Sequence, residues 1–323
     1  MIKLTRRAVV AGLGAFAAVP ARSEGAWPNR PVTLMHGFPP GGPVDTLSRI
    51  LSEGLSRQVG QPVIVDSKPG ATGTTIGGLV ARATPDGYTL MALPATYPAT
   101  AAMFNALPYN PTEDFTFIST TAEYQLVLVT YPDSEIRTVA DIISVARSRS
   151  APLLYGTAGN GSLMHLSMEL FAKKANIRLQ HVPYKGGMPA VTDLLGKRLD
   201  LVLDPPTVPV QFIRNDTLRA LAVTGASRFF ALPNVPTMIE AGFPGYVVTG
   251  YQGIVAPAGL PGAITEKINR AITAVLSEPN IVEKLKNIGN IAKPSSPEEF
   301  KARIVADIAK WKSIVADAHL ARI

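Results

Sequence analysis

Three side chains of this sequence have the types found in a hydrolytic triad: Ser162, His165 and Asp204. In such a triad a histidine activates a serine nucleophile, and a carboxylate orients the histidine. The segment Asn160-Gly161-Ser162-Leu163-Met164 lacks the Gly-x-Ser-x-Gly pattern that exposes a nucleophile between a strand and a helix. Ser162 is better suited to cap the following helix. The sequence therefore favours a protein that is not an enzyme, and a hydrolase that uses Ser162 is the alternative.

Metal and nucleotide chemistry have little support in the residue patterns. The histidines (His36, His165, His181 and His319) are scattered, no His-Glu-x-x-His occurs, and the chain has no cysteine. A phosphate-binding Gly-Lys-Ser/Thr is missing, and no Gly-x-Gly-x-x-Gly follows residue 23. We therefore expect no metal site and no cofactor.

Four glycine-containing turns are more informative. Each is predicted to follow a strand and to open a helix. Such a turn presents free backbone N–H groups and the positive end of a helix dipole, so it can hold an anion without a basic side chain. The four turns are Phe38–Asp45, Lys68–Gly73, Tyr155–Ser162 and Pro183–Gly187.

The first and third turns are the strongest candidates for one anion site. In the first, Gly41 and Gly42 allow close approach of the backbone, Pro43 fits the first helical position and Asp45 the first helical turn. Taken singly, each turn is also explained as an ordinary connection from strand to helix. Two of them in different halves of the chain favour a shared ligand, because open α/β sheets bind ligands at the carboxyl ends of their strands.

The elements that carry these turns alternate between strands and helices. Short apolar runs are typical of parallel strands covered on both faces, and helical spacing is clear in Val44, Leu47, Leu51 and Leu55. We predict an α/β fold with mostly parallel sheets. The predicted strands are 31–35, 62–65, 88–93, 126–130, 153–155, 179–182, 199–203, 218–223 and 253–256.

No strand is predicted after residue 256, and residues 263–318 are predicted to form two or three helices. The last helix should begin near Pro297, because Ser296 can act as its N-cap and Glu299 as the capping-box partner. Nine strands are many for one sheet, so we divide them between two domains with crossings near 122–126 and 248–253. Domain 1 then comprises 27–124 plus 251–323, and domain 2 comprises 125–250.

Residues 1–23 have the features of an export signal. Lys3, Arg6 and Arg7 precede an apolar run, and small residues follow it where a signal peptidase could cut. The pair Arg6-Arg7 leaves both the general secretory and the twin-arginine route open, and an uncleaved anchor is the alternative. We expect the mature chain to be exported.

The charge of the chain does not favour nucleic acid. The formal net charge is +7, but removal of residues 1–23 leaves 27 basic groups against 24 acidic ones. This excess is too small for a nucleic-acid surface. With 46% hydrophobic and only 17% charged residues, the chain is expected to be compact and globular.

The order of these segments resembles the solute-binding subunit of tripartite tricarboxylate transporters, the Bordetella-uptake-gene type of periplasmic receptor. The resemblance runs from Pro28 to the C-terminus, and the number of matching stretches in order makes it specific. These stretches are 28–32, 38–43 with Asp45 and Arg49, 60–63, 68–71 with Gly73, 85–90, 107–109, 155–162 with His165-Leu166, 181–186, 193–196, 218–224, 232–237 and 256–259.

The resemblance implies a two-domain periplasmic binding protein, a Venus flytrap that closes on a small carboxylate, with each domain a mostly parallel sheet flanked by helices. It implies a periplasmic monomer that delivers its ligand to the membrane subunits of a tripartite transporter. A receptor that feeds a sensor kinase is an alternative. In that family the loops matching Phe38–Asp45 and Gly156–Ser162 hold one carboxylate through backbone amides, hydroxyls and ordered waters.

Aromatic side chains and both loops supply the expected ligand contacts. Phe38, Tyr97, Tyr184 and Tyr251 fall in predicted loops or at strand ends, where they could line a cleft or simply pack under the loops. The expected ligand-binding set is Phe38, Gly41, Gly42, Pro43, Asp45, Thr96, Tyr97, Gly156, Thr157, Ala158, Gly159, Gly161, Ser162, His165, Lys185 and Asp204.

Three polar residues of this set have two possible roles each. His165 could donate to a carboxylate or be structural, Lys185 could neutralise a second carboxylate or be an exposed lysine, and Asp204 could select a ligand amine or hydroxyl or cap the next turn. The sequence departs from the family pattern at His36-Gly37 and at Asp204-Pro205-Pro206. Both departures could alter the far end of the pocket, so the identity of the carboxylate stays open.

Overall fold

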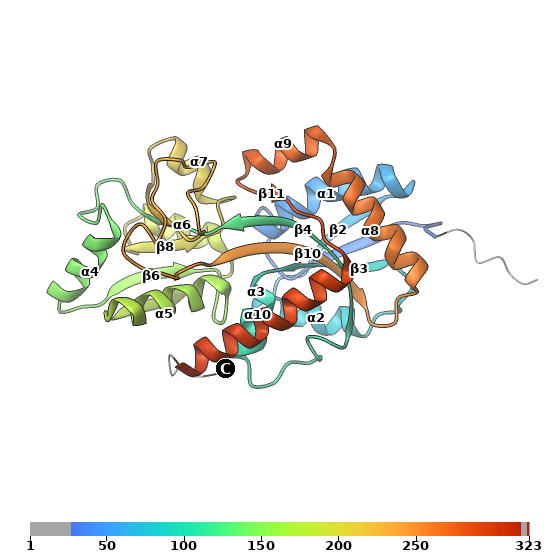
Figure 1. Ribbon diagram of the computed structural model, residues 1–323, viewed down its shortest axis with the longest axis horizontal. Coiled ribbons are helices and arrows are strands. Elements are labelled where there is room, and N and C mark those ends of the chain that lie inside the picture. Colours follow the sequence, from blue (N-terminus) through green and yellow to red (C-terminus); the bar gives the residue numbers. More distant parts are fainter. Residues whose placement is uncertain (1–26, 318–321, 323) are drawn as a thin grey trace, which may run out of the picture.

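A computed structural model describes residues 27–317 and residue 322 (Figure 1). Two β-sheets, each flanked by helices, lie side by side and form two lobes. The α/β class and the two-sheet architecture predicted from the sequence are confirmed. The predicted export signal, residues 1–23, lies outside the described residues. Among the helices of the described part of the chain, none combines the length and the apolar character needed to span a bilayer.

The sheet of the first lobe has six strands in the order β11-β4-β10-β3-β1-β2. Strand β1 pairs in parallel with β2 and β3, whereas β10 runs antiparallel to both β3 and β4, and β11 antiparallel to β4. The sheet is therefore mixed, with β1, β2, β3 and β4 running in one direction. Its strands are β1 (Val32–His36), β2 (Val63–Ser67), β3 (Thr89–Pro94), β4 (Phe115–Gln125), β10 (Thr249–Pro257) and β11 (Ile291–Ala292).

The sheet of the second lobe has five strands in the order β7-β6-β8-β5-β9. Strand β6 is parallel to β7 and β8, and β5 is antiparallel to β8 and β9, so four of the five strands share one direction. These strands are β5 (Val127–Thr130), β6 (Leu153–Thr157), β7 (Leu179–Pro183), β8 (Leu201–Asp204) and β9 (Arg219–Val223).

Helices cover both faces of each sheet, which explains the continuous apolar runs of the strands. The first lobe carries α1 (Pro43–Val59), α8 (Gly262–Leu276) and α9 (Pro279–Asn287) on one face, and α2 (Thr74–Ala81), α3 (Thr96–Met103) and α10 (Pro297–Asp317) on the other, with the 3₁₀ turn η1 (Ala71–Gly73) before α2. In the second lobe α4 (Val139–Ser148) and α5 (Leu163–Ala175) cover one face, and α6 (Gly187–Leu195) and α7 (Pro209–Arg214) the other.

Helix α1 shows how the sequence pattern produces this packing. Its predicted stripe of Val44, Leu47, Leu51 and Leu55 is buried in the core beneath the first sheet. Gly54 lets α1 approach α8 closely, because a Cβ atom at that position would lie 2.5 Å from a methyl group of Val275.

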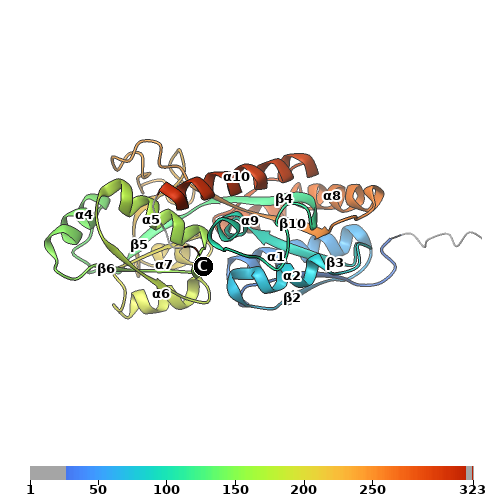
Figure 2. The same ribbon diagram turned by 90° about the horizontal axis from the view of Figure 1, so that it is seen from below.

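Helix α10 begins at Pro297, as the sequence predicts. Ser296 and Glu299 form the expected capping box: the N–H of Ser296 donates to Glu299 Oε2 (2.9 Å), and the N–H of Glu299 donates to Ser296 Oγ (3.1 Å). The helix packs on β4 and α3 of the first lobe and reaches α5 of the second (Figure 2). There Lys173 Nζ donates to the carbonyl oxygen of Asp317. One helix thus rests on both lobes.

The chain passes between the sheets at two adjacent places. Strand β4 ends at Gln125 and β5 begins at Val127, and the return path enters β10 at Thr249. Thr224 joins the two passages, because its Oγ1 accepts from the N–H of Leu126 (2.9 Å) and donates to the carbonyl of Val248 (2.6 Å). The segments that connect the lobes are therefore fixed to each other.

The prediction of no strand after residue 256 is wrong, and β4 was also missed. Strand β11 pairs with β4 at Ala122 and Glu123. Within β4 the polar run Ser119–Thr121 hides the apolar signal, yet its hydroxyls are satisfied by carbonyl oxygens of neighbouring segments at 2.6 to 3.0 Å. Buried polar side chains with partners are compatible with a central strand.

Candidate functional site

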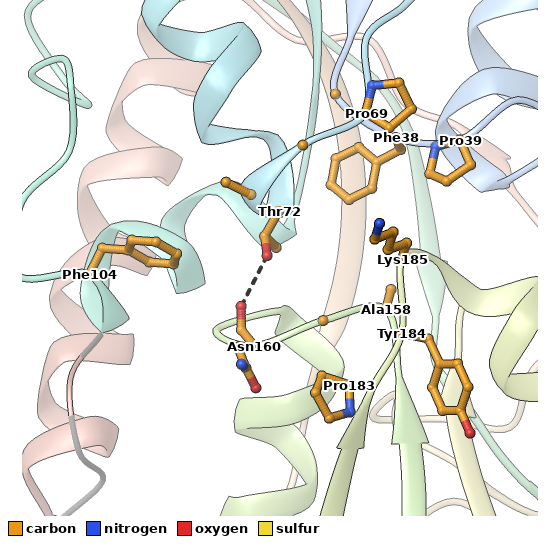
Figure 3. A pocket seen from close by; sticks show the side chains of 14 residues that line it. Phe38, Pro39, Pro69, Thr72, Phe104, Ala158, Asn160, Pro183, Tyr184 and Lys185 are labelled. Carbon is orange, nitrogen blue, oxygen red and sulfur yellow. Dashed lines mark hydrogen bonds between the residues drawn. The ribbon is translucent and has the colours of Figure 1, made fainter.

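A crevice between the lobes contains two adjoining cavities. The first, here the loop cavity, has a volume of about 570 Å³ and is lined by all four glycine-containing turns. Figure 3 shows Phe38 and Lys185 facing each other across it, and the bond from Thr72 Oγ1 to the carbonyl of Asn160 (3.1 Å), which joins the two lobes. The lining residues are Gly37–Pro39, Pro69–Thr72, Phe104, Ala158–Asn160 and Pro183–Lys185.

The second cavity, here the helix cavity, has a volume of about 280 Å³ and shares Phe38, Pro39 and Ala158 with the first. The first turns of four helices line it: those of α1 and α3 from the first lobe, and those of α5 and α6 from the second. The remaining lining residues are Pro40, Gly42, Pro94, Tyr124, Gly186, Asp204 and Pro205.

The electrostatics of the helix cavity favour a bound anion. Each helix start carries backbone N–H groups without intrahelical partners and the positive end of a helix dipole. Thr96, at the start of α3, adds a hydroxyl to the wall. Among the described residues that line this cavity, none is basic and Asp204 is the one acidic residue. A carboxylate held here would be bound by backbone dipoles and not by an ion pair.

Buried polar groups hold the first turn in shape. Asp45 accepts from the N–H of Gly41 and from Arg49 Nε, each at 2.9 Å, and bonds His36 Nε2 at 3.1 Å. His36 Nδ1 accepts from the N–H of Phe38 (3.4 Å), so its proton lies on Nε2 and is donated to Asp45. Burial opposes ionisation of Asp45, but the bonds from Arg49, Gly41 and His36 outweigh it and lower its pKa.

Neutral histidines hold the third turn. The N–H of Gly161 donates to His165 Nδ1 (3.2 Å), and the N–H of His165 donates to Ser162 Oγ (3.2 Å). The His165 ring stacks on His181 with centroids 4.0 Å apart, and His181 Nε2 bonds Thr157 Oγ1 (2.6 Å). Burial lowers the pKa of His165 to about 4; burial and the neighbouring His165 lower the pKa of His181 to about 3. Near pH 7 the turn therefore carries no imidazolium charge.

The structure brings half of the expected ligand-binding set into the crevice. Phe38, Gly42, Pro43, Thr96, Ala158 and Asp204 line the helix cavity, and Gly159 and Lys185 line the loop cavity. The other expected residues do not line either cavity, and all of them except Tyr97 lie in or beside the first and third turns: Gly41, Asp45, Tyr97, Gly156, Thr157, Gly161, Ser162 and His165.

Three of these residues have clear structural roles. Tyr97 donates to the carbonyl of Pro111 (2.9 Å) and stacks on Tyr109. A Cβ atom on Gly156 would lie 2.6 Å from Leu199, so this glycine permits close packing behind the turn. Ser162 is fully buried as the N-cap of α5, which is the role predicted for it.

Ser162, His165 and Asp204 do not form a hydrogen-bonded triad within the described residues. Both Ser162 Oγ and His165 Nδ1 accept backbone N–H groups, and Asp204 lies in the helix cavity against Gly187. The described residues also contain no group of three or more histidine or acidic side chains arranged to hold a metal ion.

Several residues that line the helix cavity were not in the expected ligand-binding set. Tyr124 belongs to β4, the strand hidden by its polar run, and Met164, Met188 and Pro189 resemble ordinary helix residues. Gly187 ended the fourth turn but was not in the expected set. The fourth turn already predicted the start of α6, so the first residues of this helix could have been added to the set, whereas β4 required the tertiary structure. Of the expected aromatics, Tyr184 lines the loop cavity and Tyr251 is buried, bonded to Asp307 (2.9 Å).

Two α/β lobes with a shared crevice at their helix starts define the class of periplasmic binding proteins, and solved members of that class match closely. A structure described as a periplasmic transporter covers 90% of this chain and 98% of its own at a TM-score of 0.87 and 30% identity. The periplasmic binding protein BugD matches with a TM-score of 0.86 at 30% identity, over 91% of this chain and 99% of its own.

The family follows from the sequence comparison: the chain belongs to the tripartite tricarboxylate transporter family receptors, whose family model matches residues 47–320. A Pseudomonas protein encoded in the tcbD-tcbE intergenic region is 34% identical, over 99% of this chain and 96% of its own. Protein BugT of Bordetella pertussis is 30% identical, over 98% of each chain.

Two solved relatives contain carboxylate ligands. Rpa4515 of R. palustris, solved with adipate, is 34% identical, with a TM-score of 0.87 over 91% of this chain and 98% of its own. MatC of Rhodopseudomonas palustris, solved with malate, is 29% identical, with a TM-score of 0.84 over 89% of this chain and 99% of its own.

Proposed function

We propose that this chain is a periplasmic receptor that captures a small carboxylate between its lobes and delivers it to the membrane subunits of a tripartite transporter. The observation that carries this proposal is the convergence of four helix starts, two from each lobe, on the helix cavity. Adipate in Rpa4515 and malate in MatC support a carboxylate as the ligand.

The proposed ligand contacts are the cavity-lining members of the expected set. The carboxylate would accept N–H groups at the start of α1 and the hydroxyl of Thr96, with Ala158 closing the opposite wall. Asp45 and His165 would act indirectly, because they keep the two turns in shape.

Capture would proceed by a shift between open and closed forms. A ligand that touches both lobes binds the closed form more tightly and so increases its population. We propose the two moving units as 27–124 plus 251–323 and 125–250. Residues 1–23 would direct export to the periplasm, where the receptor would act as a monomer without a cofactor.

Substitution of Gly42 tests the proposal directly. A Cβ atom there would meet only the carbonyl of Pro39, at 3.3 Å, and the backbone is extended with φ of −78°, so Gly42→Val should fold normally. Its side chain would fill the wall of the helix cavity. Gly262→Val is the matched control, because Gly262 also begins a helix and has open space around it.

The assay is a thermal-shift screen with dicarboxylates, tricarboxylates, aromatic acids and acidic amino acids, followed by calorimetry on each ligand that stabilises the protein. The wild type and Gly262→Val should be stabilised by the same carboxylate, and Gly42→Val should lose this response while keeping its unfolding temperature. Unchanged affinity in Gly42→Val would remove the first turn from the binding site.

A further inference from the structure

Asp204 is a buried acid in the wall of the helix cavity. It is the last residue of β8, where it pairs with Val127 of β5, and it is 1% exposed. Its carboxyl group packs against the start of α6, since a Cβ atom on Gly187 would lie 2.0 Å from Asp204 Oδ2. Strand pairing and this contact fix the position of the acid.

One oxygen of the Asp204 carboxyl group is left unpaired among the described residues. Within the described part of the chain, Oδ2 has no hydrogen-bond partner. The cavity wall around it consists mainly of proline, methionine and aromatic side chains, and the described lining residues include no lysine, arginine or histidine. Buried polar groups normally have partners, so this oxygen marks a place where a ligand group can contribute one.

The charge of Asp204 distinguishes between possible ligands. Burial raises its pKa well above the usual value, because the apolar wall disfavours a lone negative charge. A second carboxylate on the ligand would meet this acid in a cavity whose described lining residues include no basic side chain. An ammonium group would instead stabilise the ionised carboxylate of Asp204 and donate to Oδ2, and a charge-assisted bond in a dry site is strong.

We propose that Asp204 is the specificity residue of the helix cavity, and that it selects a carboxylate whose other end carries an ammonium group over a dicarboxylate of the same length. This inference rests on the proposed function, since it assumes that the helix starts hold the first carboxylate.

The test compares ligand pairs that differ only at one end. The pairs are 4-aminobutyrate with succinate, 5-aminopentanoate with glutarate, and 6-aminohexanoate with adipate; butyrate, pentanoate and hexanoate serve as singly charged references. Affinities are measured by calorimetry for the wild type, Asp204→Asn and Asp216→Asn. Asp216 is an exposed aspartate of the same lobe with φ of 55°, a conformation that asparagine tolerates, so its variant is the matched control.

In the wild type we expect at least one amino acid to bind 10-fold or more tightly than the dicarboxylate of equal length. Asp204→Asn should reduce this preference at least 10-fold, and Asp216→Asn should leave it unchanged. The unfolding temperature of Asp204→Asn should not fall, because a neutral amide replaces a buried acid whose Oδ2 has no partner among the described residues.

Two results would overturn the inference: a wild-type preference for the dicarboxylate at every length, or an unchanged preference in Asp204→Asn. The ratio of wild-type affinities for the amino acid and the dicarboxylate of equal length tests the inference even if Asp204→Asn does not fold. If the unsubstituted acids still bind, the proposed function survives and only the role of Asp204 fails. If none of the nine acids binds, the role of Asp204 is rejected, and the proposed function is then judged by the wider carboxylate screen described above.

Discussion

Acid should weaken this fold through His165, which must stay uncharged to hold the third turn. Its Nδ1 accepts the N–H of Gly161, and its Nε2 lies 4.0 Å from Glu169. Burial lowers the pKa of His165 from 6.5 to about 4. Because the unfolded chain then binds the proton more readily, this contribution to stability is present above pH 6.5 and is lost as the pH falls towards 4.

The difference between the pKa of His165 in the unfolded and in the folded chain lowers the free energy of unfolding by about 3 kcal/mol once the pH is below both values. At pH 5 the loss is about 2 kcal/mol. His165→Asn isolates this effect, because the amide oxygen can accept the N–H of Gly161 and does not titrate. His181, whose pKa is also lowered, remains in both proteins and titrates in the same direction.

The assay is urea unfolding of the wild type and His165→Asn at pH 7 and pH 5. Between these two values the free energy of unfolding of the wild type should fall by about 2 kcal/mol more than that of the variant. Equal losses in the two proteins would refute the argument, since they would mean that His165 has the same proton affinity in the folded and unfolded chains.

Two further substitutions test the first turn and the contact between the lobes. Asp45→Asn should lower the free energy of unfolding at neutral pH by about 2 to 4 kcal/mol, because a buried carboxylate loses charge-assisted bonds to Gly41 and Arg49. The pKa of Asp45 is lowered on folding, so urea unfolding should show the difference fading as the pH falls below 3.8; a constant difference would contradict this. Thr72→Val removes the bond to Asn160 and should weaken carboxylate binding about 2- to 10-fold in calorimetry, with no change in unfolding temperature. Undiminished affinity would show that this bond does not favour closure.

The sequence predicted the parts of the site that depend on local chemistry. Each of the four glycine-containing turns follows a strand and opens a helix, and all four line the loop cavity, because backbone conformation and helix starts are encoded by neighbouring residues. The nine predicted strands correspond to β1 to β3 and β5 to β10. The first residue of α10 was predicted from a capping box that acts within one helical turn.

What the sequence could not decide depends on partners far along the chain. An aspartate in a first helical turn, such as Asp45, can contact a ligand or stabilise the turn. The bond from His36 to Asp45, which only the structure shows, assigns it the structural role. The departure at His36-Gly37 is therefore part of the scaffold of the first turn, although Gly37 also touches the loop cavity. Strand β11, two residues long, exists only because β4 offers an edge to pair with.

The long C-terminal helix limits how the lobes can separate. Its first part is packed into the core of the six-stranded half, while its last residue meets Lys173 of the other half. Any widening of the crevice has to pivot about that distant contact or break it. A probe attached near Asp317, in the final turn of α10, therefore distinguishes the two motions. It would move little relative to Lys173 if the lobes rotate about this contact, and it would move away from Lys173 if the contact breaks.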